Sequence, residues 1–236
     1  MKLSDFLDGL TTGELSQVYI GGKESYGIIA EDYPAITRFI NSGLTALYTR
    51  FPLKLKEVSI QNYPHIHTYY LRKEFAVSNT ESNQPIKYIV DSKYAPFIGD
   101  VLKIDQVFSE EGFERRLNDE SAPYSVFTPE FDALVIPFNE DTNMTSVIYR
   151  ANHEKIPTEE SIDPDKISIT LPPYLEAALH SYVVSRVFKS IGGESNLNEA
   201  MLHENQYELV CSRVETSSLL NADQFTNMKL ENNGWV

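Results

Sequence analysis

The fold is decided by residues 171–215, which read LPPYLEAALHSYVVSRVFKSIGGESNLNEAMLHENQYELVCSRVE. Apolar residues recur at helical spacing in the first half of this stretch, at Leu175, Ala178, Leu179, Tyr182 and Val183. Pro172 and Pro173 suit the start of that helix, because an amide hydrogen in the first turn has no acceptor within the helix and its absence costs little. Gly192 and Gly193 supply the left-handed conformation that ends a helix. The stretch therefore predicts two helices folded against each other as a hairpin.

The second helix of this hairpin has a less regular pattern. Asn196 and Glu199 have the spacing of a capping box, in which two side chains accept bonds from backbone amides at a helix start. Glu204 interrupts the expected buried stripe. The stripe comprises Leu197, Ala200, Met201, Tyr207, Cys211 and Val214. Because Cys211 is the single cysteine and lies on this stripe, it is expected to be a small core residue rather than a reactive thiol.

Residues 216–236 form a polar tail that is rich in Ser, Asn and Asp and ends with the single tryptophan of the chain. Such a tail normally frays, because it buries too little apolar surface to offset the entropy of ordering. Spaced apolar side chains nevertheless occur along it, at Leu219, Leu220, Phe225, Met228, Leu230 and Trp235. We expect these six residues to dock on another polypeptide; the alternatives are a tail that folds back on its own domain or stays disordered.

The remaining sequence predicts an α+β protein in which a helical core is built from both ends of the chain. Residues 1–52 carry helical patterns, with Leu3, Phe6, Leu7 and Leu10 in a first helix that Ser4 caps. Thr11 and Glu14 predict a cap for a second turn, and a longer helix begins near Pro34 and stops before Pro52. Residues 157–215 complete the core with the helical hairpin.

Residues 53–156 have the signals of an inserted β domain, a small antiparallel sandwich or open barrel. Turn residues fall at Gly99, Gly112 and Asn118-Asp119. The expected strand segments are Val58–Ile60, Ile66–Phe75, Ile86–Val90, Asp100–Phe108, Tyr124–Thr128, Ala133–Phe138 and Ser146–Ala151.

The net charge of −14, from 20 basic and 34 acidic residues, does not favour tight binding to nucleic acid. The charge fits either a channel wall that repels DNA and lets it slide, or simply a soluble subunit. No apolar run has the roughly 20 residues that span a bilayer, and the first residues lack the pattern of a signal peptide. We therefore expect no membrane association and synthesis in the cytoplasm.

The search for catalytic and metal motifs was mostly negative. His65 and His67 would share one face of a strand, as a metal site requires, but a third ligand is not close in sequence. His153-Glu154 and His203-Glu204 lack the spacing of a zinc protease helix, and no phosphate loop, GxSxG or GxGxxG occurs. Glu110-Glu111 and Glu159-Glu160 are expected to be solvated acids. We predict no enzyme activity, catalytic residue, metal or cofactor.

Two segments carry a family resemblance: Ile169–Glu215, and Leu15–Leu53 with its sequence INSGLTALYTRFPL at residues 40–53. Together with the β insertion and the tail, they resemble the head-to-tail adaptor (connector) proteins of tailed bacteriophages. The resemblance implies a structural protein of the virion neck, made in the host cytoplasm, that forms a ring of about twelve copies between the portal and the tail. It also implies that the tail docks on the portal protein, that the β domain faces a tail tube or nozzle protein, and that DNA passes through without specific binding. A virion-associated peptidoglycan-degrading enzyme and a carbohydrate-binding β module are the alternatives.

Overall fold

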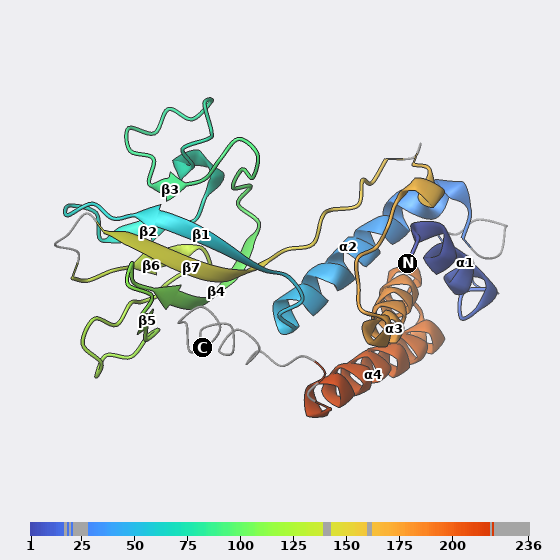
Figure 1. Ribbon diagram of the computed structural model, residues 1–236. Coiled ribbons are helices and arrows are strands. Elements are labelled where there is room, and N and C mark those ends of the chain that lie inside the picture. Colours follow the sequence, from blue (N-terminus) through green and yellow to red (C-terminus); the bar gives the residue numbers. More distant parts are fainter. Residues whose placement is uncertain are drawn as a thin grey trace, which may run out of the picture. The chain divides into compact units, whose positions relative to one another are not determined.

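The computed structural model describes residues 1–16, 18, 20, 28–138, 143–159, 162–217 and 219. The chain divides into two compact units. The α unit comprises residues 1–51 and 153–236, and the β unit comprises residues 52–152. The described residues contain four α-helices, a five-stranded antiparallel sheet and a two-stranded sheet, and they form no closed barrel (Figure 1). The expected α+β class is therefore confirmed.

The α unit is built on the hairpin of α3 (Pro173–Ile191) and α4 (Glu194–Thr216), which lie side by side (Figure 1). Helix α3 begins at the predicted prolines, and its predicted stripe is buried except for the half-buried Tyr182. Gly192 and Gly193 have φ angles of 75° and 85°, which confirms why two glycines stand at the turn. The amide of Asn196 donates to the Gly192 carbonyl, and α4 begins two residues earlier than the expected capping box.

Helix α2 (Tyr33–Arg50) packs against α3 at an unusually close approach. A Cβ atom placed on Gly43 would lie 2.8 Å from Leu179 Cδ1 and 2.8 Å from Tyr182 Cδ1. The absent side chain of Gly43 therefore lets the two helices meet. The short helix η2 (Ala30–Asp32) precedes α2, and the cap of α2 at Phe51 comes directly before Pro52, as the sequence predicts.

Helix α1 (Leu3–Thr12) buries the four leucine and phenylalanine residues of its predicted stripe. Two details of the expectation were wrong. The helix is capped at Lys2 rather than Ser4, and Thr11 starts no second turn, because its hydroxyl donates to the Leu7 carbonyl within α1. The ring of Phe6 meets His180 of α3 edge-on at 4.5 Å, and the Leu3 amide donates to Ile167, which follows the short helix η4 (Pro164–Lys166).

The segment that returns from the β unit runs beside α2 (Figure 1). The side chain of Asn41 holds it there. The Asn41 amide donates to the Ile156 carbonyl at 2.8 Å, and its oxygen accepts from the Ile156 amide at 3.0 Å. His153 of the same segment is also buried. Its Nε2 atom lies 3.1 Å from the Asn41 carbonyl oxygen and 3.2 Å from Oγ1 of Thr45, which is one helical turn after Asn41. These bonds dock an extended segment along a helix whose backbone groups are already paired.

The β unit has two sheets, with strand order β3-β1-β7-β4-β5 in one and β2-β6 in the other. All strand pairs are antiparallel. The strands are β1 (Leu55–Gln61), β2 (Thr68–Tyr70), β3 (Ile89–Val90), β4 (Val101–Phe108), β5 (Glu114–Arg115), β6 (Ala133–Val135) and β7 (Met144–Ala151), with a short helix η3 (Lys73–Phe75). The expected strand at Tyr124–Thr128 is wrong, because this segment makes isolated bridges only, and β5 was not expected.

Both sheets contribute to one hydrophobic core of the β unit. Tyr69 of β2 and Tyr88 meet edge-on at 5.0 Å, and Phe75 stacks on Tyr88 at 4.7 Å. The Tyr88 hydroxyl donates to the Tyr70 carbonyl and accepts from the Tyr70 amide. Burial raises the pKa of Tyr88 above its ordinary value of 10.0. The hydroxyl therefore stays protonated and holds β2 at this place in the core.

Candidate functional site

The six predicted docking residues can be placed only in part. Leu219 is described and is 55% exposed. The other five lie outside the described residues, namely Leu220, Phe225, Met228, Leu230 and Trp235. Their docking role therefore stays a prediction.

Helix α4 has two faces of different character. The side that packs on α3 is buried, and it comprises Ala200, His203, Tyr207, Cys211 and Val214. The expectation that Leu197 and Met201 belong to this stripe was wrong, because they are 47% and 60% exposed. His203 takes a place there instead, with its ring stacked on Phe188 of α3. Cys211 is buried as expected, and burial raises the pKa of its thiol.

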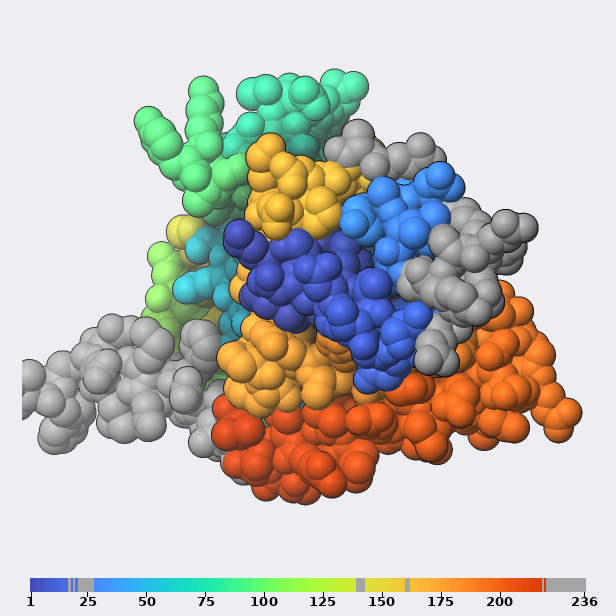
Figure 2. All heavy atoms as spheres, turned by 90° about the vertical axis from the view of Figure 1, so that its right-hand side faces the viewer, coloured from blue at the N-terminus to red at the C-terminus, as the bar shows by residue number. Residues whose placement is uncertain are grey.

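The opposite side of α4 presents apolar residues to solvent. Leu202 and Leu209 are 59% and 51% exposed. Because they are seven residues apart, they lie nearly one above the other, about two turns apart. Figure 2 shows α4 in orange and red along the lower side of the α unit, with α3 and then α1 above it in this view. We call Leu202, Leu209 and the flanking Met201 the outer face of α4.

The C-terminal end of α4 is tied to α2 by Arg50. The Arg50 guanidinium donates to Glu215 through Nε at 2.7 Å and Nη2 at 3.2 Å, and to Glu208 through Nη1 at 2.7 Å. The hydrogen bond from Arg50 holds the pKa of Glu215 below its ordinary value of 4.5. The last turn of α4, directly before the predicted docking tail, is thereby fixed on the α unit.

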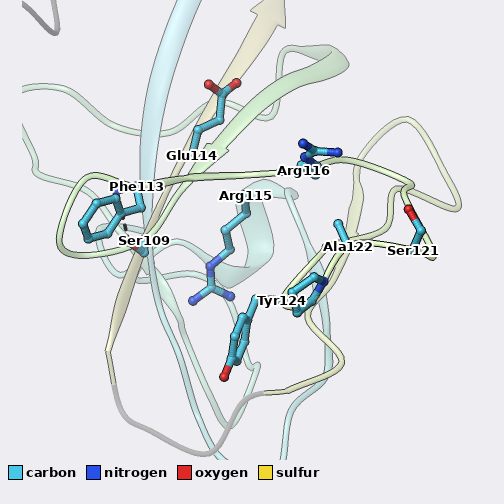
Figure 3. Close-up of a pocket in the computed structure, with 9 residues that line it drawn as sticks. Ser109, Phe113, Glu114, Arg115, Arg116, Ser121, Ala122 and Tyr124 are labelled. Atoms are coloured by element: carbon cyan, nitrogen blue, oxygen red, sulfur yellow. Dashed lines mark hydrogen bonds between the residues drawn. The ribbon is translucent and has the colours of Figure 1, made fainter.

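A pocket of about 590 Å³ lies in the β unit, beside β5 and the loop that follows it (Figure 3). It is lined by Ser109, Phe113, Glu114, Arg115, Arg116, Ser121, Ala122, Pro123 and Tyr124. Figure 3 shows Arg115 extending from the strand toward Tyr124, whereas Glu114 points the other way, as expected for neighbours on a strand. This volume is within the range of small-molecule sites.

The loop that forms one wall of the pocket is held by its own side chains. The Ser125 hydroxyl donates to the Arg116 carbonyl at 2.8 Å, and Asn118 accepts from the Thr128 amide at 2.9 Å. Tyr124 has a φ angle of 63°, which is strained for a residue with a large side chain. The expected strand at 124–128 does not form because the chain turns at Tyr124, and that turn places the tyrosine at the pocket.

The two histidines considered as a metal pair, His65 and His67, are not arranged as the sequence suggests. His65 lies in a turn and His67 precedes β2, so they do not share a strand face. Within the described ranges, no three His, Cys, Asp or Glu side chains gather as a metal site would require. A helix with the length and apolarity to cross a bilayer is also not found among the described residues.

Comparison of the sequence with models of protein families gave no match, and comparison with curated proteins gave none either. Reasoning about function therefore starts from the two surfaces above. Sequence reasoning missed both. The seven-residue spacing of Leu202 and Leu209 was a usable signal for the outer face. The pocket had no comparable signal, since its residues come from separate turns.

Proposed function

We propose that this chain is a structural virion protein, a head-to-tail adaptor that forms a ring between the portal and the tail and leaves a channel for DNA. The resemblance of residues 15–53 and 169–215 to such adaptors motivates the proposal. The observation that carries it is the outer face of α4, because leucines that are more than half exposed on a well-packed helix fit a contact with another protein surface. In a ring, that surface belongs to a second copy of this chain.

The finer architecture belongs to the same proposal. We take the β unit to be an insertion of sandwich type, because its two sheets share one core, and residues 216–236 to be an extended tail. The tail binds the portal protein and the β unit faces the tail tube or nozzle protein. The net charge of −14 supports a channel through which DNA passes without specific binding. The protein is then located in the virion neck.

Deletion of residues 216–236 tests the docking tail. The truncated protein should fail to join DNA-filled heads. Each large apolar side chain that the tail buries contributes about 2 kcal/mol of binding free energy, and the deletion removes this contribution from every copy of the ring. Joining is measured by sedimentation of heads mixed with the purified protein. The truncated chain should keep the circular dichroism and melting temperature of the full chain. Joining at normal yield by the truncated protein would show that the tail does not dock.

Substitution of the outer face tests the ring contact. The double variant Leu202→Glu and Leu209→Glu should stay folded, since both residues are exposed and surface changes usually alter stability by less than about 0.5 kcal/mol. With portal present it should form no ring, whereas the unchanged chain gives one, as measured by mass photometry. Phe131→Glu in the β unit, at a residue 62% exposed, is the matched control. A ring of normal mass from the double variant would contradict this contact, and a stable dimer that cleaves glycan would favour the peptidoglycan-degrading enzyme.

A further inference from the structure

The pocket of the β unit contains an arginine whose charge is not matched by its neighbours. Among the residues that the structure describes, none makes a hydrogen bond or ion pair with the Arg115 guanidinium. The adjacent Arg116 is engaged, because its Nη1 donates to Asp119 at 3.1 Å. Glu111 acts on Arg115 electrostatically without forming an ion pair with it. The Arg115 side chain lines the pocket and extends toward Tyr124 (Figure 3).

Burial makes this arrangement costly. Arg115 is half-buried, and the desolvation lowers the pKa of its guanidinium, an effect that Glu111 only partly opposes. Arginine stays charged at any physiological pH. A partly desolvated cation is stabilised by a bound anion, and carboxylates match the planar guanidinium with two parallel hydrogen bonds. The pocket is thus suited to a carboxylate.

Aromatic rings stand exposed on both sides of this arginine. Phe113 is 73% exposed and Tyr124 is 69% exposed, and Phe138 meets the Tyr124 ring edge-on at 6.4 Å. The strained backbone at Tyr124 turns this large ring toward solvent. Aromatic faces carry partial negative charge and attract the polarised C–H groups of a sugar ring. Ser109 and Ser121 add hydroxyl groups to the pocket lining.

From this geometry we infer that the pocket between β5 and the 116–124 loop binds an acidic sugar, with its carboxylate on Arg115 and its ring against Tyr124 or Phe113. A pocket of about 590 Å³ accommodates a ring with its substituents, whereas an isolated acidic side chain would leave the aromatic faces uncovered. A long polyanion such as nucleic acid is disfavoured by the net charge of the chain. This inference does not depend on the adaptor proposal.

The test is an NMR titration of the full chain with galacturonic acid oligosaccharides as the probe. Amide signals of residues 109–124 should shift on addition of the acidic sugar, and the matched neutral galactose oligosaccharides should bind at least tenfold more weakly, since they lack the charge-assisted bonds. N-acetylglutamate represents a peptide carboxylate and should also bind at least tenfold more weakly. Binding of the acidic sugar should weaken as salt rises.

Three variants locate the interaction. Arg115→Gln should weaken binding of the acidic sugar at least tenfold, and Tyr124→Asn should weaken it while preserving the turn, because asparagine adopts a positive φ more readily than tyrosine. Lys93→Gln is the control and should change the affinity little, because Lys93 is an exposed cation of the β unit that does not line the pocket. The inference is overturned by absence of binding, by equal binding of the neutral sugar or of N-acetylglutamate, or by unchanged binding in Arg115→Gln.

Discussion

Replacing Gly43 with alanine should destabilise the α unit by about 1–3 kcal/mol, the usual cost of an extra group in a packed interior. The added Cβ would lie 2.8 Å from atoms of both Leu179 and Tyr182. Leu179 is fully buried, and Tyr182 is restrained by the Ser42 hydroxyl and by the Tyr207 ring. Because Leu179 is fully buried and Tyr182 is held by these contacts, relief of both close approaches requires the side chains or the two helices to shift.

The sign of the change in unfolding free energy distinguishes a close helix contact from an ordinary helix position. Glycine to alanine inside an exposed helix normally stabilises by about 1 kcal/mol. Urea unfolding of the purified chain followed by far-ultraviolet circular dichroism measures the change, and Arg38→Ala at an exposed position of α2 serves as the control. A Gly43→Ala protein as stable as the parent, or more stable, would mean that α2 and α3 do not approach as closely as the structure places them.

Replacing Asn41 with alanine should cost the α unit about 2–4 kcal/mol, because two hydrogen bonds to Ile156 are lost at once and each unpaired buried group costs about 1–3 kcal/mol. Ile156 is only 5% exposed, so water does not readily replace the asparagine. The returning segment should then detach from α2 and open the contact of His153 with Thr45.

Hydrogen exchange read by mass spectrometry distinguishes this local effect from general instability. The amides of residues 153–159 should exchange faster in Asn41→Ala, and those of β1 and β7 should not change. Asn196→Ala is the matched control, since Asn196 makes a hydrogen bond from its side chain to one backbone carbonyl at the hairpin turn. Unchanged protection of the returning segment in Asn41→Ala would refute the role given to Asn41.

The helical hairpin was predictable because its signals are local. Prolines at the start of α3, a regular stripe along it and two glycines at its end each act within one or two turns. Helix α4 was harder, because a polar helix gives little contrast between its faces. A sequence pattern treats His203 as polar, yet its ring is buried and stacks on Phe188. The buried side of α4 therefore includes His203 and leaves out Leu197 and Met201, which were expected there.

The β unit and its pocket depend on contacts between distant residues. Runs of ten residues with strand character yield strands as short as Thr68–Tyr70, because pairing ends where a partner strand ends. The pocket required the turn at Tyr124, which is not made by a glycine. Asn118, whose side-chain oxygen accepts from the Thr128 amide, and Ser125, whose hydroxyl donates to the Arg116 carbonyl, hold this turn. A positive φ at tyrosine is not predictable from local preference.

The α unit is discontinuous in the chain, and this orders events on the ribosome. Helices α1 and α2 are synthesised first, but α3, on which both pack, follows only after residues 52–152 have been made. At roughly 5–20 residues per second, those intervening residues take about 5–20 seconds. Once residue 152 has been made, the β unit has all of its own strands, whereas the apolar sides of α1 and α2 still await α3 and are a natural place for a chaperone to bind.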